Sequence, residues 1–466
     1  MLDETLLDAP EALARADRRG LLRAAAEAGA RVRTAARHAA EAGIADLRPD
    51  GRPRTVLVAG PGTAAVGVAD LVGTLAGAAA PVIRLRPTGV APAAGALRWE
   101  LPGWAGSLDL LLIPTTDGAE PGLALLAQQA YRRGVTVVAV APQRSPLAES
   151  VVAARGLVVP LAIAPHAMYD EEILAASTAS LWALFTPLLA LLDRVGLLTA
   201  PPEALERVAD RLDRTAERCG PAVATYDNPA KTLAAELADS LPLIWTEGET
   251  AGPIGRRFAA VLAELAGLPA LAAELPEALP SHGVLLAGDY AAGADPDDFF
   301  RDRVDEPQAL HARVVLLRDR PAGGLTAAPA ARELALSHDT PISELEPTLD
   351  AGDGNENGMG NGGAGEGPDN ATGTERGGNG TAGSDEAATL EALAELLAVT
   401  DFAAVYLSLA SAVDAAGITG ATEPPTRASD RPTTGADSDS DTDVATGTGT
   451  GTDAGTDADS DSHGGS

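Results

Sequence analysis

The 466-residue sequence contains little cysteine, lysine or aromatic side chain, and each shortage narrows what the protein can be. Its single cysteine, Cys219, excludes an internal disulfide and a cysteine-based zinc site. This cysteine precedes a Gly-Pro pair near a predicted helix end, which indicates an unreactive, partly buried thiol and not a nucleophile. Aromatic residues make up only 3% of the chain, so a core must be built from Leu, Ala and Val. One lysine, Lys231, among 34 lysine and arginine residues indicates a GC-rich coding bias.

The net charge of −32 argues against binding to nucleic acid or to anionic membrane surfaces. Nearly half of this charge lies in two segments rich in Gly, Asn, Asp, Ser and Thr. Residues 347–386 hold eight acidic residues and one arginine, and residues 421–466 hold ten and two. Such segments bury too little apolar surface to fold, so we predict a disordered insertion (347–386) and a disordered acidic tail (419–466). The Asp-Ser runs lack the fixed Gly and Glu of a calcium loop.

Nothing in the sequence indicates export or a membrane segment. Its opening residues are unlike a signal peptide, because no charged start is followed by an apolar core. The longest apolar runs, such as 181–192, are too short or too interrupted to span a bilayer. A cytoplasmic protein is therefore expected.

Apolar strands alternate with helices over most of the chain. After N-terminal helices (1–50), strands are predicted at 52–60, 81–87, 108–113, 135–140 and 157–162, each joined by a Gly-punctuated turn or a helix. The helices 172–197 and 203–219 follow. This spacing predicts an α/β fold with a doubly wound parallel sheet in a first domain (51–200).

The same pattern restarts after residue 200. Here the predicted elements are a helix (228–240), a strand (241–248), a helix (253–267), an extended piece (270–277), a helical or strand-like piece (282–290), a strand (311–319) and a final helix (387–417). We therefore predict a second, smaller α/β domain (201–346 plus 387–418) of the same class.

The first strand leads into a glycine-bearing turn that could bind a phosphate. Gly60, Gly62 and Thr63 lie between a strand and a helix, where backbone N–H groups and a helix N-terminus can face an anion. The turn is neither a Walker motif nor a G-x-G-x-x-G dinucleotide motif. Ordinary strand-to-helix packing explains the glycines about as well.

A second turn follows strand 108–113 in the same way. Thr115, Thr116 and Gly118 would suit oxyanion binding, whereas Asp117 and Glu120 would repel a phosphate. The simpler interpretation is that Asp117 caps a helix with Glu120 three residues on.

The segment 244–282 carries the side chains best suited to proton transfer. Arg257 and Glu264 are seven residues apart on a predicted helix and should share one face. His282 follows a Leu-Pro-Glu bend that ends at Glu277. An arginine, a carboxylate and a histidine close together would suit a phosphorylated substrate, although a solvated helix face and a surface histidine are the plainer alternatives. No pair of histidines has metal-ligand spacing, so no metal is expected.

These landmarks, with the closing TDFAAVYLSLA, resemble the bifunctional phosphoglucose/phosphomannose isomerases, a family with two SIS (sugar isomerase) domains. The resemblance covers roughly residues 20–320 and the last helix. It implies two SIS-type domains, no cofactor, a sugar phosphate as ligand and a homodimer. By position it makes Glu264 the proton-transfer residue, His282 the ring-opening residue, and Arg257 with the glycines and threonines of both turns the substrate-binding residues.

The sequence departs from the family at several site positions. Ala64 stands where the first phosphate-binding serine is expected, and Asp117 and Glu120 replace two hydroxyls of the second turn. Two functions are therefore expected in this order. The first is isomerisation of glucose or mannose 6-phosphate to fructose 6-phosphate through a cis-enediol. The second is a catalytically silent SIS protein that binds a sugar phosphate as a regulator or assembly partner.

Overall fold

The structure is a computed structural model that describes residues 2–89, 97–162, 178–288, 310–320, 326–348 and 380–411. All of these lie within one compact unit, residues 1–415. Several predictions fall outside the described residues: the start of helix 172–197, most of the insertion, the end of helix 387–417 and the whole acidic tail.

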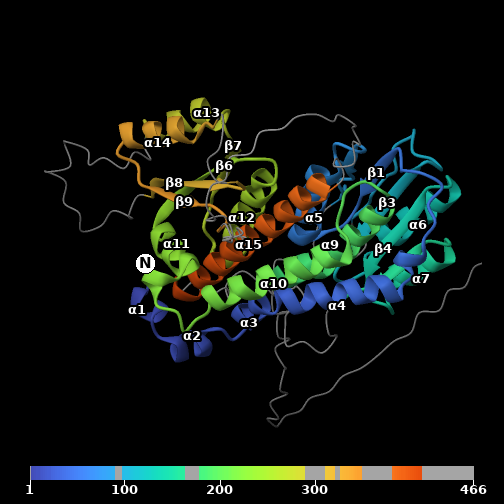
Figure 1. Ribbon diagram of the computed structural model, residues 1–466, viewed down its shortest axis with the longest axis horizontal. Coiled ribbons are helices and arrows are strands. Elements are labelled where there is room, and N and C mark those ends of the chain that lie inside the picture. Colours follow the sequence, from blue (N-terminus) through green and yellow to red (C-terminus); the bar gives the residue numbers. More distant parts are fainter. Residues whose placement is uncertain are drawn as a thin grey trace, which may run out of the picture. The chain divides into compact units, whose positions relative to one another are not determined.

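The first sheet is parallel, as the sequence predicts, and its five strands have the order β2-β1-β3-β4-β5. Figure 1 shows β1, β3 and β4 side by side. The strands are β1 (Thr55–Val58), β2 (Val82–Arg84), β3 (Asp109–Pro114), β4 (Thr136–Ala141) and β5 (Leu157–Pro160). The central strands β1 and β3 are buried along their whole length, which explains their unbroken apolar runs. Their register pairs Val56 with Leu110 and Val58 with Leu112.

Helices cover both faces of this sheet, which makes it doubly wound. On one face α5 and α9 pack against Val56, Leu110 and Val138, with α4 and α10 in the same hydrophobic cluster. On the other face α6 and α7 pack against Leu57 and Leu111. The helix bounds are α4 (Ala28–Glu41), α5 (Gly62–Ala76), α6 (Pro121–Arg132), α7 (Pro146–Ala153), α9 (Thr178–Arg194) and α10 (Pro202–Arg218).

The second sheet has four parallel strands in the order β7-β6-β8-β9 (Figure 1). The strands are β6 (Ser240–Glu247), β7 (Leu271–Glu274), β8 (His311–Arg318) and β9 (Ile342–Leu345). Side chains of β6 alternate between the two faces. Ile244 belongs to the cluster that contains α11, α12 and α15, and Trp245 belongs to the cluster beneath α13 and α14.

The helices around the second sheet are α11 (Pro229–Leu237), α12 (Ala251–Ala266), α13 (Ala278–Leu286), α14 (Ala328–Ser337) and α15 (Gly380–Ala410). The short N-terminal helices α1 (Glu4–Leu7), α2 (Pro10–Ala16) and α3 (Leu21–Ala26) pack on the α15 side. Two 3₁₀ turns, η1 (Ile44–Asp46) and η2 (Thr225–Asp227), complete the described elements. Both α/β layers predicted from the sequence are present.

Helix α15 connects the two hydrophobic clusters. Its residues from Leu390 to Ala398 pack in the cluster of the first sheet, and those from Val399 to Ala410 pack in that of the second. Its portion Glu386–Ala410 is long and apolar enough to cross a membrane by length and composition. However, 89% of the apolar window is buried inside the protein, so the helix is apolar because it is a core element.

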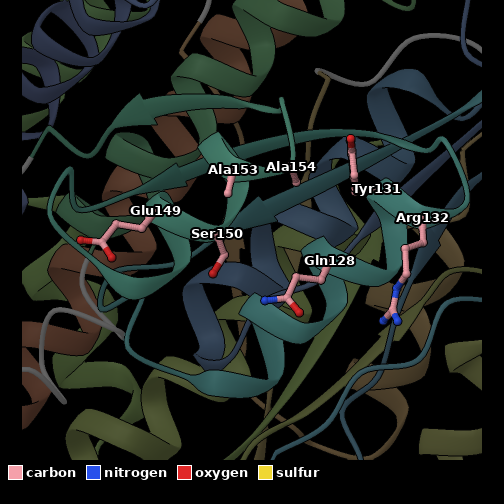
Figure 2. A pocket seen from close by; sticks show the side chains of 7 residues that line it. All are labelled: Gln128, Tyr131, Arg132, Glu149, Ser150, Ala153 and Ala154. Carbon is pink, nitrogen blue, oxygen red and sulfur yellow. The ribbon is translucent and has the colours of Figure 1, made fainter.

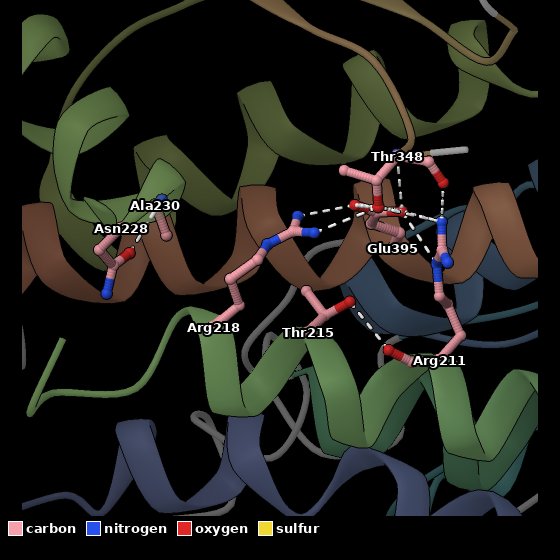
Figure 3. Close-up of polar contacts among 7 residues, drawn as sticks. All are labelled: Arg211, Thr215, Arg218, Asn228, Ala230, Thr348 and Glu395. Carbon is pink, nitrogen blue, oxygen red and sulfur yellow. Dashed lines mark hydrogen bonds and ion pairs between the residues drawn. The ribbon is translucent and has the colours of Figure 1, made fainter. Parts of the chain in front are cut away.

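A buried carboxylate holds α15 against α10 (Figure 3). Glu395 is 1% exposed and lies 2.5 Å from Nη2 of Arg211 and 2.7 Å from Nη2 of Arg218. The backbone N–H of Thr348 donates to the same carboxylate at 3.1 Å. Charged partners therefore satisfy this buried acid and also attach the segment that leaves β9.

Lys231 is fully buried on α11. Its ammonium group donates to the carbonyl oxygens of Pro221 and Val223 at 2.8 and 2.7 Å. It also lies 5.5 Å from the ring centroid of Tyr406 on α15. Burial lowers the pKa of this amine. The chain's one lysine therefore binds the segment 221–223 to the core.

The N-terminal helices are α1 to α4, with an αL residue at Gly20 before α3. Of the two alternatives for the piece that begins at residue 282, the structure has the helical one, because residues 282–286 belong to α13. Two details differ from the sequence predictions. Helix α14 and strand β9 were not predicted, although they lie within 201–346. Helix α15 begins at Gly380, inside the predicted insertion, whose polar composition hid this start.

Candidate functional site

The candidate site lies at the carboxyl ends of β1 and β3 in the first sheet. In a doubly wound sheet, ligands bind where neighbouring strands lead to opposite sides. The order β2-β1-β3-β4-β5 places this switch point between β1 and β3. The turn after β1 holds Gly60, Gly62 and Thr63, and the turn after β3 holds Thr115, Thr116 and Gly118. Six predicted substrate-binding residues therefore lie at this switch point, the position where folds of this class have their binding crevice.

Close packing explains two of the glycines at this crevice. A Cβ on Gly60 would lie 2.3 Å from the carbonyl oxygen of Pro114, so the first turn rests directly on the end of β3. Gly118 has a φ of +68° and its Cβ would lie 2.5 Å from Oγ of Ser145. Both turns therefore require glycine, and the second is held against the start of α7.

The second turn uses part of its polar capacity internally. Thr115 is buried and its hydroxyl oxygen accepts a 3.2 Å hydrogen bond from the N–H of Gly118. Thr116 is half-buried and Asp117 is exposed. The predicted N-cap at Asp117 is wrong, because α6 begins at Pro121 and is capped by Glu120. Glu120 accepts from the N–H of Gly122 at 3.3 Å, so this acid has a structural role.

The first turn leaves its helix without a side-chain cap. Helix α5 begins at Gly62, which has a φ of +79°, and the preceding Pro61 makes no capping hydrogen bond. By contrast, Glu120 caps α6 and Ser145 caps α7. The first N–H groups of a helix carry a partial positive charge. Because those of α5 are not capped by a side chain, the start of α5 is more suitable for an anion than the starts of α6 and α7.

Glu264 reaches this crevice from the second half of the chain. It is exposed on α12, and the hydroxyl of Thr63 donates a hydrogen bond to its carboxylate. The structure therefore brings together a predicted proton-transfer residue and a predicted phosphate-binding residue that are 201 positions apart. No sequence spacing indicated this contact.

Arg257 and Glu264 face the same neighbouring helix, as their spacing predicts, but their surroundings differ. The side chain of Arg257 packs against Gly67 of α5, whose Cβ would lie 3.2 Å from its Cδ. Arg257 is only 4% exposed and its Nη1 donates to Asp401 of α15. In this arrangement Arg257 holds α12 to α15, while Glu264 is open to solvent. Sequence reasoning missed Asp401 altogether.

His282 lies away from these residues. It is buried on α13, and its Nδ1 accepts a 2.9 Å hydrogen bond from Nε1 of Trp245. Burial lowers the pKa of this imidazole. Trp245 faces the α13 side of the sheet, whereas Thr246 faces α12 at Gly255. The expected grouping of arginine, carboxylate and histidine is therefore not formed, because His282 and Glu264 lie on opposite faces of the second sheet.

At the corresponding switch point of the second sheet, an acidic side chain of the protein bonds to the start of a helix. The carboxyl ends of β6 and β8 meet there, and Asp319 follows β8. Its carboxylate accepts from the N–H and the hydroxyl of Thr250 at 2.7 and 3.0 Å, just before α12. An internal acid thus occupies the place that an anionic ligand would take.

Two cavities of the described structure lie elsewhere. One, of about 520 Å³, lies between α6 and α7, with Tyr131 and Arg132 on one side and Glu149 and Ser150 on the other (Figure 2). The other, of about 640 Å³, lies among α4, α9 and α10. Neither is lined by a predicted site residue. Among the described residues no group of three or more His, Cys, Asp or Glu side chains could hold a metal ion.

Comparison with known proteins gives one family match. Residues 226–351 match the bacterial phospho-glucose isomerase C-terminal SIS domain. This range includes all four strands of the second sheet and α12 with Glu264. No curated protein sequence matches the chain.

Solved structures with a related course of the chain were also found. A glucose-6-phosphate isomerase like protein from Thermus thermophilus is 18% identical over 79% of this chain and 85% of its own, with a TM-score of 0.39. Tagatose-6-phosphate ketose/aldose isomerase from Escherichia coli is 12% identical over 84% and 91%, with a TM-score of 0.42. These likenesses are too low to carry an argument about function. On this match over residues 226–351 and on its two parallel sheets, the chain resembles the SIS-domain bacterial phosphoglucose isomerases.

Proposed function

We propose that the protein is an aldose–ketose isomerase of hexose 6-phosphates, which converts glucose or mannose 6-phosphate to fructose 6-phosphate through a cis-enediol. One observation carries the proposal: Glu264 of the matched SIS domain contacts Thr63 at the crevice of the first sheet. The family match supplies the reaction class. The contact gives the proton-transfer residue a place beside a site suited to a phosphate.

The phosphate would lie at the start of α5. The N–H groups of the first turn of this helix and the hydroxyl of Thr63 lie at that position, and the half-buried Thr116 belongs to the neighbouring turn after β3. Backbone N–H groups at a helix N-terminus stabilise a dianion by both hydrogen bonding and the helix dipole. Gly60 and Gly118 allow the two turns to lie close to each other and to their neighbours.

The chemistry requires a carboxylate that moves one proton between two carbons. Glu264 would remove the proton from C2 of the open-chain aldose. The C–H electrons would form the C1=C2 bond, while the C1=O double bond opens and O1 takes up a proton to give the enediol. The C2 hydroxyl would then lose its proton and form the C2=O bond, while the C1=C2 electrons take the proton back from Glu264 at C1. One proton is gained at O1 and one is lost from O2, so the net reaction consumes no proton. His282 is remote from Glu264, so we assign the open-chain sugar, rather than ring opening at His282, to this site.

The acidic second turn favours the other candidate, a catalytically silent protein that binds a sugar phosphate. Asp117 is exposed at the crevice, where its charge opposes a phosphate. The substitution Asp117→Ser separates the two candidates. Removing this charge should raise the affinity for sugar phosphate in either case, but only an isomerase should also gain turnover.

A coupled assay for fructose 6-phosphate formation tests the proposal. Wild type, Glu264→Gln and the control Glu333→Gln would each receive glucose 6-phosphate and then mannose 6-phosphate. Glu333 is exposed on α14, on the other side of the second sheet. We expect turnover by wild type and the control, and a loss of at least about 100-fold in Glu264→Gln. Absence of turnover in all three proteins would reject the isomerase in favour of the silent binding protein.

The proposal includes a homodimer, on the family resemblance alone. The chain has a mass of 47.0 kDa, so light scattering on the eluted protein should give twice this value. A monomer at micromolar concentration would contradict it.

A further inference from the structure

The contact between Thr63 and Glu264 places a carboxylate where the proposed phosphate must lie. Thr63 is the second residue of α5 and belongs to the first helical turn. The N–H groups of this helical turn have no side-chain cap. The hydroxyl of Thr63 donates to Glu264, so an internal negative charge already faces the helix N-terminus. A phosphate dianion at this helix start and the Glu264 carboxylate would be close neighbours, and their like charges would repel each other.

The backbone of α12 is fixed beside α5 by other contacts. Nε of Arg256 donates to Asp70 of α5 at 3.2 Å, and Arg257 packs against Gly67. Arg257 is held in turn by its buried pair with Asp401. These contacts hold the backbone of α12, whereas the Glu264 side chain is exposed and its carboxylate accepts a hydrogen bond from Thr63.

We propose that Thr63 and Glu264 form a latch that phosphate binding opens. This inference rests on the proposed function and adds a regulation to it. A threonine hydroxyl carries one proton, so it donates either to Glu264 or to a phosphate oxygen, but not to both. When a phosphate arrives, it takes the Thr63 hydrogen bond and repels the carboxylate, which turns away from α5 toward the sugar carbons.

The exposure of the pair suits this exchange. Hydrogen-bonded charges at the surface contribute little to stability, so opening the latch costs little. The N–H groups of α5 then hold the phosphate in place of the carboxylate. Thr63 thus acts as a positioning residue for Glu264, and the carboxylate is released only when the phosphate end of the substrate is bound.

Binding of inorganic phosphate, measured by calorimetry, tests the latch without any turnover. Glu264→Gln removes the competing charge and should bind phosphate at least about fivefold more tightly than wild type. The control Glu333→Gln has the same change in charge on α14 and should leave the affinity unchanged.

A double-mutant cycle shows whether the two residues act together. In Thr63→Val the carboxylate is no longer held over α5, so Glu264→Gln should then raise the phosphate affinity by a smaller factor than it does in wild type. The latch would be overturned by an equal increase in affinity in both backgrounds, by no increase in Glu264→Gln, or by no phosphate binding in any variant. These outcomes are independent of the isomerase assay, because a turning-over enzyme without the gain would retain the proposed function and lose only the latch.

Discussion

The indole N–H of Trp245 donates a 2.9 Å hydrogen bond to Nδ1 of His282. This bond requires Nδ1 to be unprotonated, so the buried imidazole is neutral and carries its proton on Nε2. The pair joins β6 to α13 on the face of the second sheet that is away from Glu264. In this structure, His282 therefore fixes a helix to the sheet.

A neutral buried histidine makes stability depend on pH. Burial lowers the pKa of His282 in the folded chain, so the unfolded chain binds this proton at a higher pH. The free energy of unfolding should therefore fall as the pH drops from 7 through the ordinary imidazole value of about 6.5. His282→Asn keeps an acceptor near the position of Nδ1 but cannot take up the proton. Denaturant titrations at pH 7 and pH 5 should show a smaller loss in this variant, and equal losses would contradict the assignment.

The buried pair of Arg257 and Asp401 should be essential for folding. Arg257→Met leaves a buried carboxylate without its guanidinium, which should lower the free energy of unfolding by about 3–5 kcal/mol. The adjacent Arg256→Met is a matched control, because its contacts with Asp70 and Glu274 are at the surface and should contribute about 1 kcal/mol or less.

The double variant Arg257→Met with Asp401→Leu is the second test of this buried pair. Replacing both charges by apolar groups should restore most of the lost stability. If Arg257→Met is no less stable than Arg256→Met, the role of the pair in holding α12 to α15 is wrong.

Two glycines of the same region should respond oppositely to alanine. A Cβ on Gly60 would overlap the carbonyl oxygen of Pro114, so Gly60→Ala should lower the free energy of unfolding by about 1–3 kcal/mol. It should also lower the proposed isomerase activity, because it displaces the turn after β1. Gly73 lies inside α5 with no atom within 4 Å of the added carbon. Gly73→Ala should therefore be neutral or stabilising by about 0.5–1 kcal/mol. Urea unfolding of both variants would check the contrast.

Cys219 should react with thiol reagents only when the chain unfolds. The side chain is fully buried at the end of α10, and burial raises the pKa of its thiol to about 12. A disulfide reagent at pH 8 should leave the native protein unmodified for hours and modify one thiol per chain in denaturant. Rapid modification of the native protein would show that the end of α10 opens locally.

The sequence predicted most strands but few long-range contacts. Unbroken apolar runs identified β3, β4 and β8, because strands buried on both faces have that composition. Strand β9 and helix α14 escaped notice because their apolar residues are interleaved with polar ones. Both glycine-bearing turns follow a buried strand as the sequence predicts, since such a turn is a local pattern.

The arrangement of the site could not be read from spacing alone. Seven residues on a helix placed Arg257 and Glu264 toward α5, but nothing local revealed that Asp401 pairs with the arginine. Thr63 and Glu264 meet only because α12 packs on α5, which is a tertiary relationship. The expected proximity of His282 failed because one step along β6, from Trp245 to Thr246, changes the face of the sheet.

The burial of Lys231 has a consequence for the chemistry of the whole surface. It is the chain's one lysine, so the folded protein presents no lysine amine to solvent. Amine-directed crosslinkers, and any enzyme that attaches a protein tag to lysine, would find no lysine on it in the native state. A lysine-specific protease has a single target, and its cut into residues 1–231 and 232–466 would report unfolding of the core. Apart from six histidines, every other basic side chain is an arginine. The positive charges that these side chains contribute at the surface are therefore guanidinium groups, whereas most proteins also have lysine ammonium groups there.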